Sequence, residues 1–178
     1  MKSERTIDQK FRELKFILEN RDKESIKMDA HGGHSVLFIY PPNEEINYLE
    51  RLREEYPDAD IINIADSFVE YIDQFGLGEF TNAYNDYQSD PQKLFKDFLD
   101  LIINRIDKAG KENKLPILVR TGVLSGTGIE NISIMDSQIV HSLSKPLVIL
   151  YPATEAGDKR LKFLNYKPAS DYRSIVIY

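Results

Sequence analysis

Five short apolar runs, spaced through the chain, constrain the fold more than any other feature of this sequence. The first run is apolar at successive positions, and a strand of this kind buries both faces, as in a parallel sheet. The runs are 35–40, 61–64, 116–119, 146–151 and 174–178, and segments of helical periodicity between them are 43–53, 66–75, 91–110 and 132–143. We therefore expect a three-layer α/β fold, in which a mostly parallel sheet of about five strands has helices on both faces.

The length of 178 residues is usual for one domain, and we expect a single α/β domain over 1–178. Residues 1–30 are expected to form an N-terminal helix and loop, and residues 31–178 the core. Apolar residues at helical spacing place that first helix at 5–20. The polar stretches expected to be loops are 21–31 and 79–90.

Composition argues against several classes of protein. The sequence has no cysteine, which excludes disulfides, a thiolate nucleophile and cysteine-ligated metals, and fits a reducing compartment. The N-terminus is charged, and every apolar run is far shorter than the ~20 residues that cross a bilayer, so we expect a cytoplasmic protein without membrane contact. The net charge of −6 argues against direct nucleic-acid binding, which usually depends on a basic patch.

Ligands of parallel α/β sheets bind at the carboxyl ends of the strands, so the residues after each apolar run are the places to look for chemistry. The first run is followed by Pro41, Pro42, Glu44 and Glu45. Two prolines lack amide donors and two glutamates add negative charge, where a P-loop has glycines, a lysine and a hydroxyl. This turn argues against conventional ATP hydrolysis.

A segment rich in glycines and hydroxyls follows the third run and carries an alternative hypothesis. Its candidate cofactor-binding residues are Thr121, Gly122, Ser125, Gly126, Thr127 and Gly128. The backbone amides of such a loop can form an anion-binding nest, with Asp66 or Glu155 holding a metal. No lysine follows, and the spacing matches neither the P-loop nor the dinucleotide fingerprint, so a flexible loop is the simpler interpretation.

Other candidate groups are incomplete. His31 and His34 are separated by two glycines and lack further ligands, so we predict no metal site. The chain has three histidines, and none is singled out as a base for Ser125 or Ser137, so we predict no catalytic residue. We also expect no resident cofactor.

Tyrosines carry the partner-binding hypothesis. The chain has ten Tyr, and those in expected loops that we predict to bind a partner are Tyr84, Tyr87, Tyr166 and Tyr172. Exposed tyrosines are enriched at protein–protein contact surfaces. The alternative is that they lie over the sheet edge as part of the core.

Four further motifs follow one another along the chain. They are a glycine-rich lead into a strand ending Tyr-Pro-Pro (Gly33–Glu45), a strand running into Thr-Gly-Val (Ile117–Val123), a strand ending Tyr-Pro-x-Thr (Leu147–Thr154), and a closing Leu-x-x-Phe…Tyr-Arg pattern (Leu161–Arg173). In order and spacing this set resembles the BrxB-type proteins of BREX phage-defence islands, over most of the chain from about residue 30. Met135, Asp136 and Ser137 stand where that family tends to carry an Arg-Ser-His-like segment, so no role of such residues transfers.

The resemblance implies a P-loop-like core that lacks the Walker A motif. It also implies a non-catalytic protein–protein interaction component of a bacterial BREX-type antiviral defence system, whose partners are the other proteins of that system. The alternative function is a nucleotide- or phosphate-binding enzyme or regulator that uses the Gly122–Gly128 loop.

Overall fold

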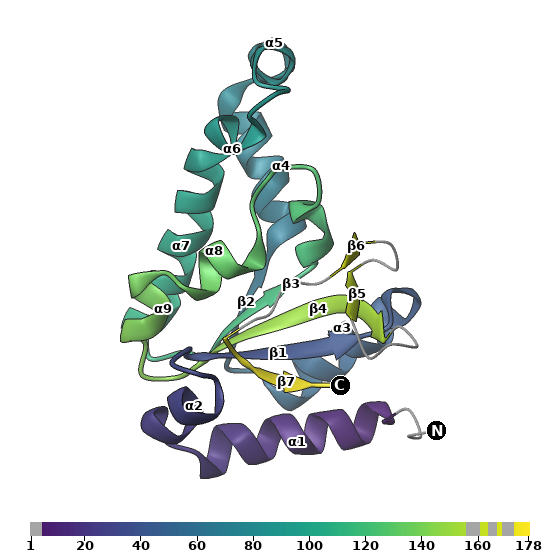
Figure 1. The fold of residues 1–178 in the computed structure, drawn as a ribbon, viewed down its shortest axis with the longest axis vertical. Coiled ribbons are helices and arrows are strands. Elements are labelled where there is room, and N and C mark those ends of the chain that lie inside the picture. The colour runs from purple at the N-terminus through teal and green to yellow at the C-terminus, as the bar shows by residue number, and fades with distance from the viewer. Residues whose placement is uncertain (1–4, 156–160, 164–166, 169–172) are drawn as a thin grey trace.

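The computed structural model describes residues 5–155, 161–163, 167–168 and 173–178 (Figure 1). The predicted three-layer α/β fold is confirmed, because five parallel strands lie between two layers of helices. These strands are β1 (Ser35–Tyr40), β2 (Asp60–Asn63), β3 (Pro116–Val119), β4 (Leu147–Glu155) and β7 (Ile175–Ile177), in the order β2-β3-β4-β1-β7. Two short strands, β5 (Leu161–Phe163) and β6 (Lys167–Pro168), continue from β4 in antiparallel pairing.

Helices cover both faces of the sheet. On one face lie α1 (Ile7–Asn20), α2 (Lys23–Asp29) and α3 (Glu45–Glu55). On the other lie α4 (Ile64–Phe75), α5 (Leu77–Asp86), α6 (Pro91–Leu94), α7 (Lys96–Lys111), α8 (Asn131–Met135) and α9 (Gln138–Ser142). Two 3₁₀ turns follow strand ends, η1 (Pro42–Glu44) and η2 (Thr121–Leu124).

The central strand β1 supplies both halves of the core. Phe38 and Tyr40 face α1 and α3, whereas Leu37 and Ile39 face the layer that contains α4 and α7. All six residues of β1 are buried. This is the pattern that an apolar run without polar alternation predicts for a strand covered on two sides.

Helix starts follow local side-chain chemistry. Thr6 caps α1 by accepting a hydrogen bond from the Gln9 amide at 3.3 Å, and the Gln9 side chain accepts one from the Thr6 amide at 2.9 Å, which is a capping box. Asn63 ends β2 and caps α4 by accepting from the Ala65 amide at 3.0 Å. The helix therefore begins at Ile64, two residues before the segment 66–75 that its periodicity predicts, and no loop separates it from the strand.

Two stretches expected to be loops are helical. Residues 21–31 contain α2, which is seven residues long, is capped by Asp22 and buries only Ile26, so it has no apolar stripe to reveal it. Residues 79–90 contain most of α5, although none of its residues is buried. Conversely, the single helix expected at 132–143 is two short helices, interrupted at Asp136 and Ser137.

The connection between β2 and β3 covers residues 64–115, and we define its outer part, residues 64–104, as the helical lobe. In Figure 1 the helices α4 and α7 extend away from the sheet, and α5 lies at the far end. Rings hold these helices together: the centroids of Phe68 and Phe98 are 5.3 Å apart, and those of Tyr71 and Phe98 are 5.5 Å apart. The Tyr71 hydroxyl donates to the Leu94 carbonyl oxygen at 2.6 Å, which fixes α4 against the end of α6.

Candidate functional site

The carboxyl edge of the parallel sheet is the first place to look for a site. The chain leaves β1 toward α3 on one face and leaves β3 toward α8 on the other, and β4 lies between these two strands. A crevice at such a reversal is where open α/β sheets bind ligands. The question is what fills that crevice in this chain.

A side-chain network joins the ends of β1 and β3. The Tyr40 hydroxyl donates to Glu45 Oε1 at 2.8 Å, and Arg120 Nε lies 3.8 Å from Glu45 Oε2. Burial, and then the hydrogen bond to the Glu45 carboxylate, raises the pKa of Tyr40 well above its ordinary value, so its hydroxyl stays a donor. The sequence indicated Glu45 as a repulsive charge, but it missed that Arg120 compensates it.

The backbone of β4 occupies the space between those strand ends. Tyr40 is paired with Pro152, and β4 then continues for Ala153–Glu155, where it pairs with β5. The strand was expected to end near Tyr151, since proline cannot donate to a ladder. Pairing with β3 ends at Leu118 opposite Ile149, so Pro152 lies beyond that ladder and is tolerated as on an edge strand.

Two threonine hydroxyls of the glycine-rich loop, and several of its backbone amides, form hydrogen bonds within the protein. Thr121 is buried and donates to the Leu150 carbonyl oxygen at 3.0 Å, which fastens the loop to β4. Thr127 donates to the Leu124 carbonyl oxygen at 2.8 Å and accepts from the Ile129 amide at 3.1 Å.

Backbone conformation explains why two positions of this loop are glycine. Gly126 and Gly128 have positive φ angles of 89° and 76°, a conformation that favours glycine. The amides of Ser125 and Thr127 donate to the carbonyl oxygens of Gly122 and Leu124, at 3.0 and 3.1 Å. The proposed phosphate nest therefore coincides with a segment in which the Thr127 hydroxyl and the amides of Ser125 and Thr127 already close turns of the loop.

The two histidines of the His-Gly-Gly-His motif are not brought together as ligands. His34 is fully buried, with Nδ1 3.3 Å from the Val140 carbonyl oxygen, whereas His31 is exposed. Burial lowers the pKa of His34 below its usual value, and nearby Lys23, Lys27 and His141 act in the same direction. Among the described residues, no group of three or more His, Asp or Glu side chains could hold a metal ion.

Two of the four predicted partner-binding tyrosines lie on the helical lobe. Tyr84 is on α5 and Tyr87 follows its last residue, and each is exposed. Tyr166 and Tyr172 lie outside the described residues. Sequence reasoning missed Leu77, the first residue of α5, which is 72% exposed beside these tyrosines in sequence. A leucine directly after a helix-ending glycine, in a polar segment, is the signal that could have found it.

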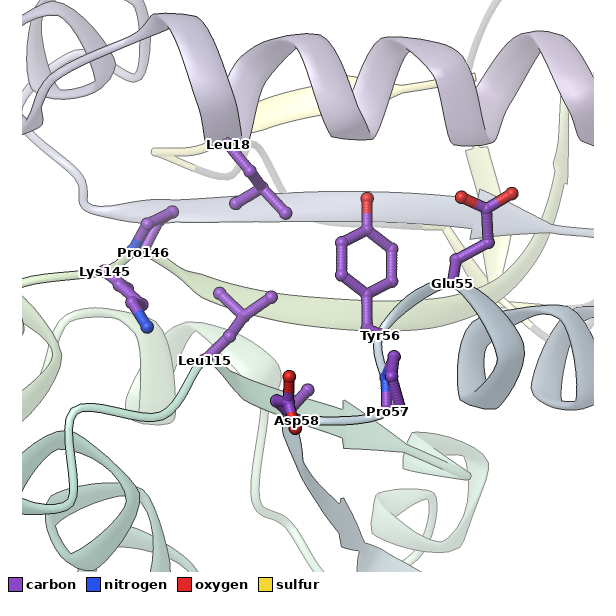
Figure 2. A pocket seen from close by; sticks show the side chains of 9 residues that line it. Leu18, Glu55, Tyr56, Pro57, Asp58, Leu115, Lys145 and Pro146 are labelled. Atoms are coloured by element: carbon purple, nitrogen blue, oxygen red, sulfur yellow. The ribbon is translucent and has the colours of Figure 1, made fainter.

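A separate cavity of about 300 Å³ lies at the opposite, amino edge of the sheet. Figure 2 shows it between Leu18 of α1, Tyr56 and Pro57 after α3, and Leu115 before β3. Burial raises the pKa of Tyr56 to about 12. Three charged residues line it: Glu55 pairs with Arg51 at 2.8 Å, Lys145 donates to the Asn113 carbonyl oxygen at 2.6 Å, and Asp58 forms no ion pair within the described residues. The cavity therefore combines largely apolar walls with one carboxylate, that of Asp58, which has no ion-pair partner among the described residues.

Comparisons with protein-family models, with curated proteins and with solved structures give no match to this chain. Within the described ranges, no helix has both the length and the apolar character needed to cross a bilayer.

Proposed function

We propose that this chain works by binding partner proteins, without catalytic activity of its own, as a component of a BREX-type antiviral defence system. The observation that supports it is the occupied carboxyl edge of the sheet. The end of β4 and the Tyr40–Glu45–Arg120 network lie where α/β folds usually hold a ligand. The sequence motifs that resemble BrxB-type proteins supply the biological setting.

The chemistry of that edge disfavours a triphosphate. Binding one requires several amide donors and a cation that the protein does not already use. Pro41 and Pro42 have no amide hydrogen, the Thr121 hydroxyl is buried against Leu150, and Arg120 faces Glu45. A bound phosphate would therefore have to break hydrogen bonds and an ion pair that the fold already makes. Losing these contacts would cost more free energy than the new contacts with phosphate would supply.

Co-purification tests the proposal. The tagged chain is produced together with the products of the genes that neighbour its own, and the expected result is a stable complex with at least one of them. Purified chain that binds none of these products, one by one or together, would overturn the proposal.

A nucleotide assay tests the same proposal from the other side. We expect no change in melting temperature with ATP and Mg²⁺, because only a ligand that binds the folded state stabilises it. ATP turnover, or a rise of several degrees that Gly126→Val abolishes, would instead favour the phosphate-binding alternative.

A further inference from the structure

We infer that the tip of the helical lobe, formed by Leu77, Tyr84, Tyr87 and the carboxylates around them, binds a basic surface of a partner protein. This inference rests on the proposed function and names the surface and the charge of the partner. Three properties of the lobe carry it: its exposed apolar side chains, its packed support and its charge.

The first property is that large apolar side chains of the lobe are exposed to solvent rather than packed in the core. No residue of α5 is buried, although the helix contains Leu77 and Tyr84, which are 72% and 43% exposed. Val69 on α4 is 58% exposed, and Tyr87 is 43% exposed. Leu77, Tyr84 and Tyr87 therefore lie together on and just after α5 at the far end of the lobe, and exposed aromatic and large aliphatic side chains are typical of contact surfaces.

The second property is packed support beneath Tyr84. The ring of Tyr84 stacks on Phe80 with centroids 6.2 Å apart and planes at 27°. Phe80 in turn contacts Phe68, Phe75 and Phe95 at centroid distances of 6.4, 6.0 and 6.0 Å. A side chain that is already held loses little conformational freedom on binding, which favours affinity.

The third property is charge. Residues 64–104 contain eight Asp and Glu and two Lys, a net charge of −6, whereas the remaining residues contain 21 acids and 21 bases. The outer part of the connection is therefore acidic, whereas the end of α7 nearest the sheet is basic: residues 64–115 as a whole contain ten acids and six bases, a net charge of −4. Carboxylates there that form no ion pair within the described residues are Asp66, Asp73, Glu79, Asp86, Asp97 and Asp100.

The charge selects among the possible occupants of this surface. Two lobes of charge −6 repel each other, which disfavours a second copy of the chain. Nucleic-acid phosphates and anionic lipid surfaces are repelled for the same reason. A protein surface that presents lysines and arginines around an apolar depression matches both the carboxylates and the exposed Leu77.

The test uses the full chain and the purified products of the neighbouring genes as probes. Leu77→Ser combined with Tyr87→Ser is expected to weaken binding at least tenfold, because both side chains would lie at the centre of the contact. The matched control is Met28→Ser with Ile46→Ser, two side chains that are 77% and 69% exposed on the other helical layer, and it is expected to bind as wild type. Melting curves confirm that each variant folds.

A second set of variants tests the charge. Asp73→Asn, Glu79→Gln and Asp86→Asn together are expected to slow association several-fold and to flatten its dependence on salt between 50 and 300 mM, as electrostatic steering predicts. Glu44→Gln, Glu50→Gln and Glu54→Gln, which remove the same charge from exposed positions elsewhere, are expected to change neither.

The outcomes separate the two proposals. If the wild-type chain binds no neighbouring product, the proposed function fails and this inference fails with it. If it binds but the lobe variants bind equally well, only the inference fails. Salt-insensitive binding would overturn the basic partner, and a wild-type dimer that Leu77→Ser dissociates would show a second copy on this surface instead.

Discussion

The carboxyl edge of the sheet and the tip of the helical lobe differ in whether their side chains find partners within the protein. At the edge, Tyr40, Glu45 and Thr121 find partners inside the protein. At the tip, Leu77 faces solvent and carboxylates such as Glu79 have no ion pair among the described residues. A region whose groups satisfy one another has little free energy to offer a ligand, whereas a region with unused groups does.

The largest expected effect concerns what holds the lobe together. Phe98 is fully buried among the rings of Phe68, Tyr71 and Phe95. Replacing a buried phenylalanine by alanine leaves a cavity, so Phe98→Ala is expected to lower the free energy of unfolding by about 3–5 kcal/mol in urea denaturation. Phe16→Ala, at a side chain that is 55% exposed, should change it by less than about 0.5 kcal/mol. Equal effects of the two substitutions would contradict a packed lobe.

The next effect concerns the closed edge. Thr121→Val removes the hydroxyl that donates to the Leu150 carbonyl oxygen and leaves that oxygen buried without this donor. The expected loss of stability is about 1–3 kcal/mol. Thr81→Val is the control on the lobe, because Thr81 is exposed and water can replace its bond to the Leu77 carbonyl oxygen. A smaller loss for Thr121→Val than for Thr81→Val would argue that the edge is less closed than its contacts indicate.

A smaller effect appears in the pH dependence of stability. Burial lowers the pKa of His34, so below about pH 6.5 the unfolded chain takes up a proton that the folded chain resists. The contribution of neutral His34 to the stability of the fold is therefore complete above that pH, and it is lost as the pH falls toward the pKa of His34 in the folded state. Urea midpoints between pH 7.5 and 5.5 should decline less steeply for His34→Gln than for wild type. His31→Gln, at an exposed position, should retain the wild-type slope, and the same flattening in both variants would rule out His34 as the source.

The smallest expected effect on stability is at the tip. Leu77→Ser should change the free energy of unfolding by less than about 0.5 kcal/mol, because most of the Leu77 side chain is exposed to solvent. Thermal denaturation checks this value, with Met28→Ser as the comparison. A loss of more than about 1 kcal/mol would show that Leu77 belongs to the lobe's packing, and the contrast with the edge would weaken.

The sequence predicted the sheet well because its central strands are apolar on both faces, a pattern that does not depend on distant contacts. It failed at α2 and α5 for one physical reason. Each helix is short and buries little: α2 fully buries only Ile26, and α5 has no fully buried residue, with only Phe80 and Ala83 partly buried against the core. Such helices are set by their neighbours, as when Phe80 packs on Phe68, and not by local pattern.

The site was predicted only in part. The prolines and glutamates after the first strand predicted an edge unsuited to a triphosphate, but the ion pair of Glu45 with Arg120 joins residues 75 positions apart, which no local motif reveals. Tyr84 and Tyr87 were chosen by residue type, and the structure places both on the lobe. The concentration of charge on 64–104 is visible in the sequence alone, yet it becomes meaningful only when those residues form one protruding body.

The lobe leaves the sheet at β2 and returns at β3, and these two strands are direct neighbours. Its far end can therefore gain, lose or exchange residues while every strand pairing stays in register. The residues proposed to select the partner therefore lie in the lobe, whereas the residues that form the sheet lie in the strands. Relatives that share the sheet but meet different proteins would be expected to diverge first at α5.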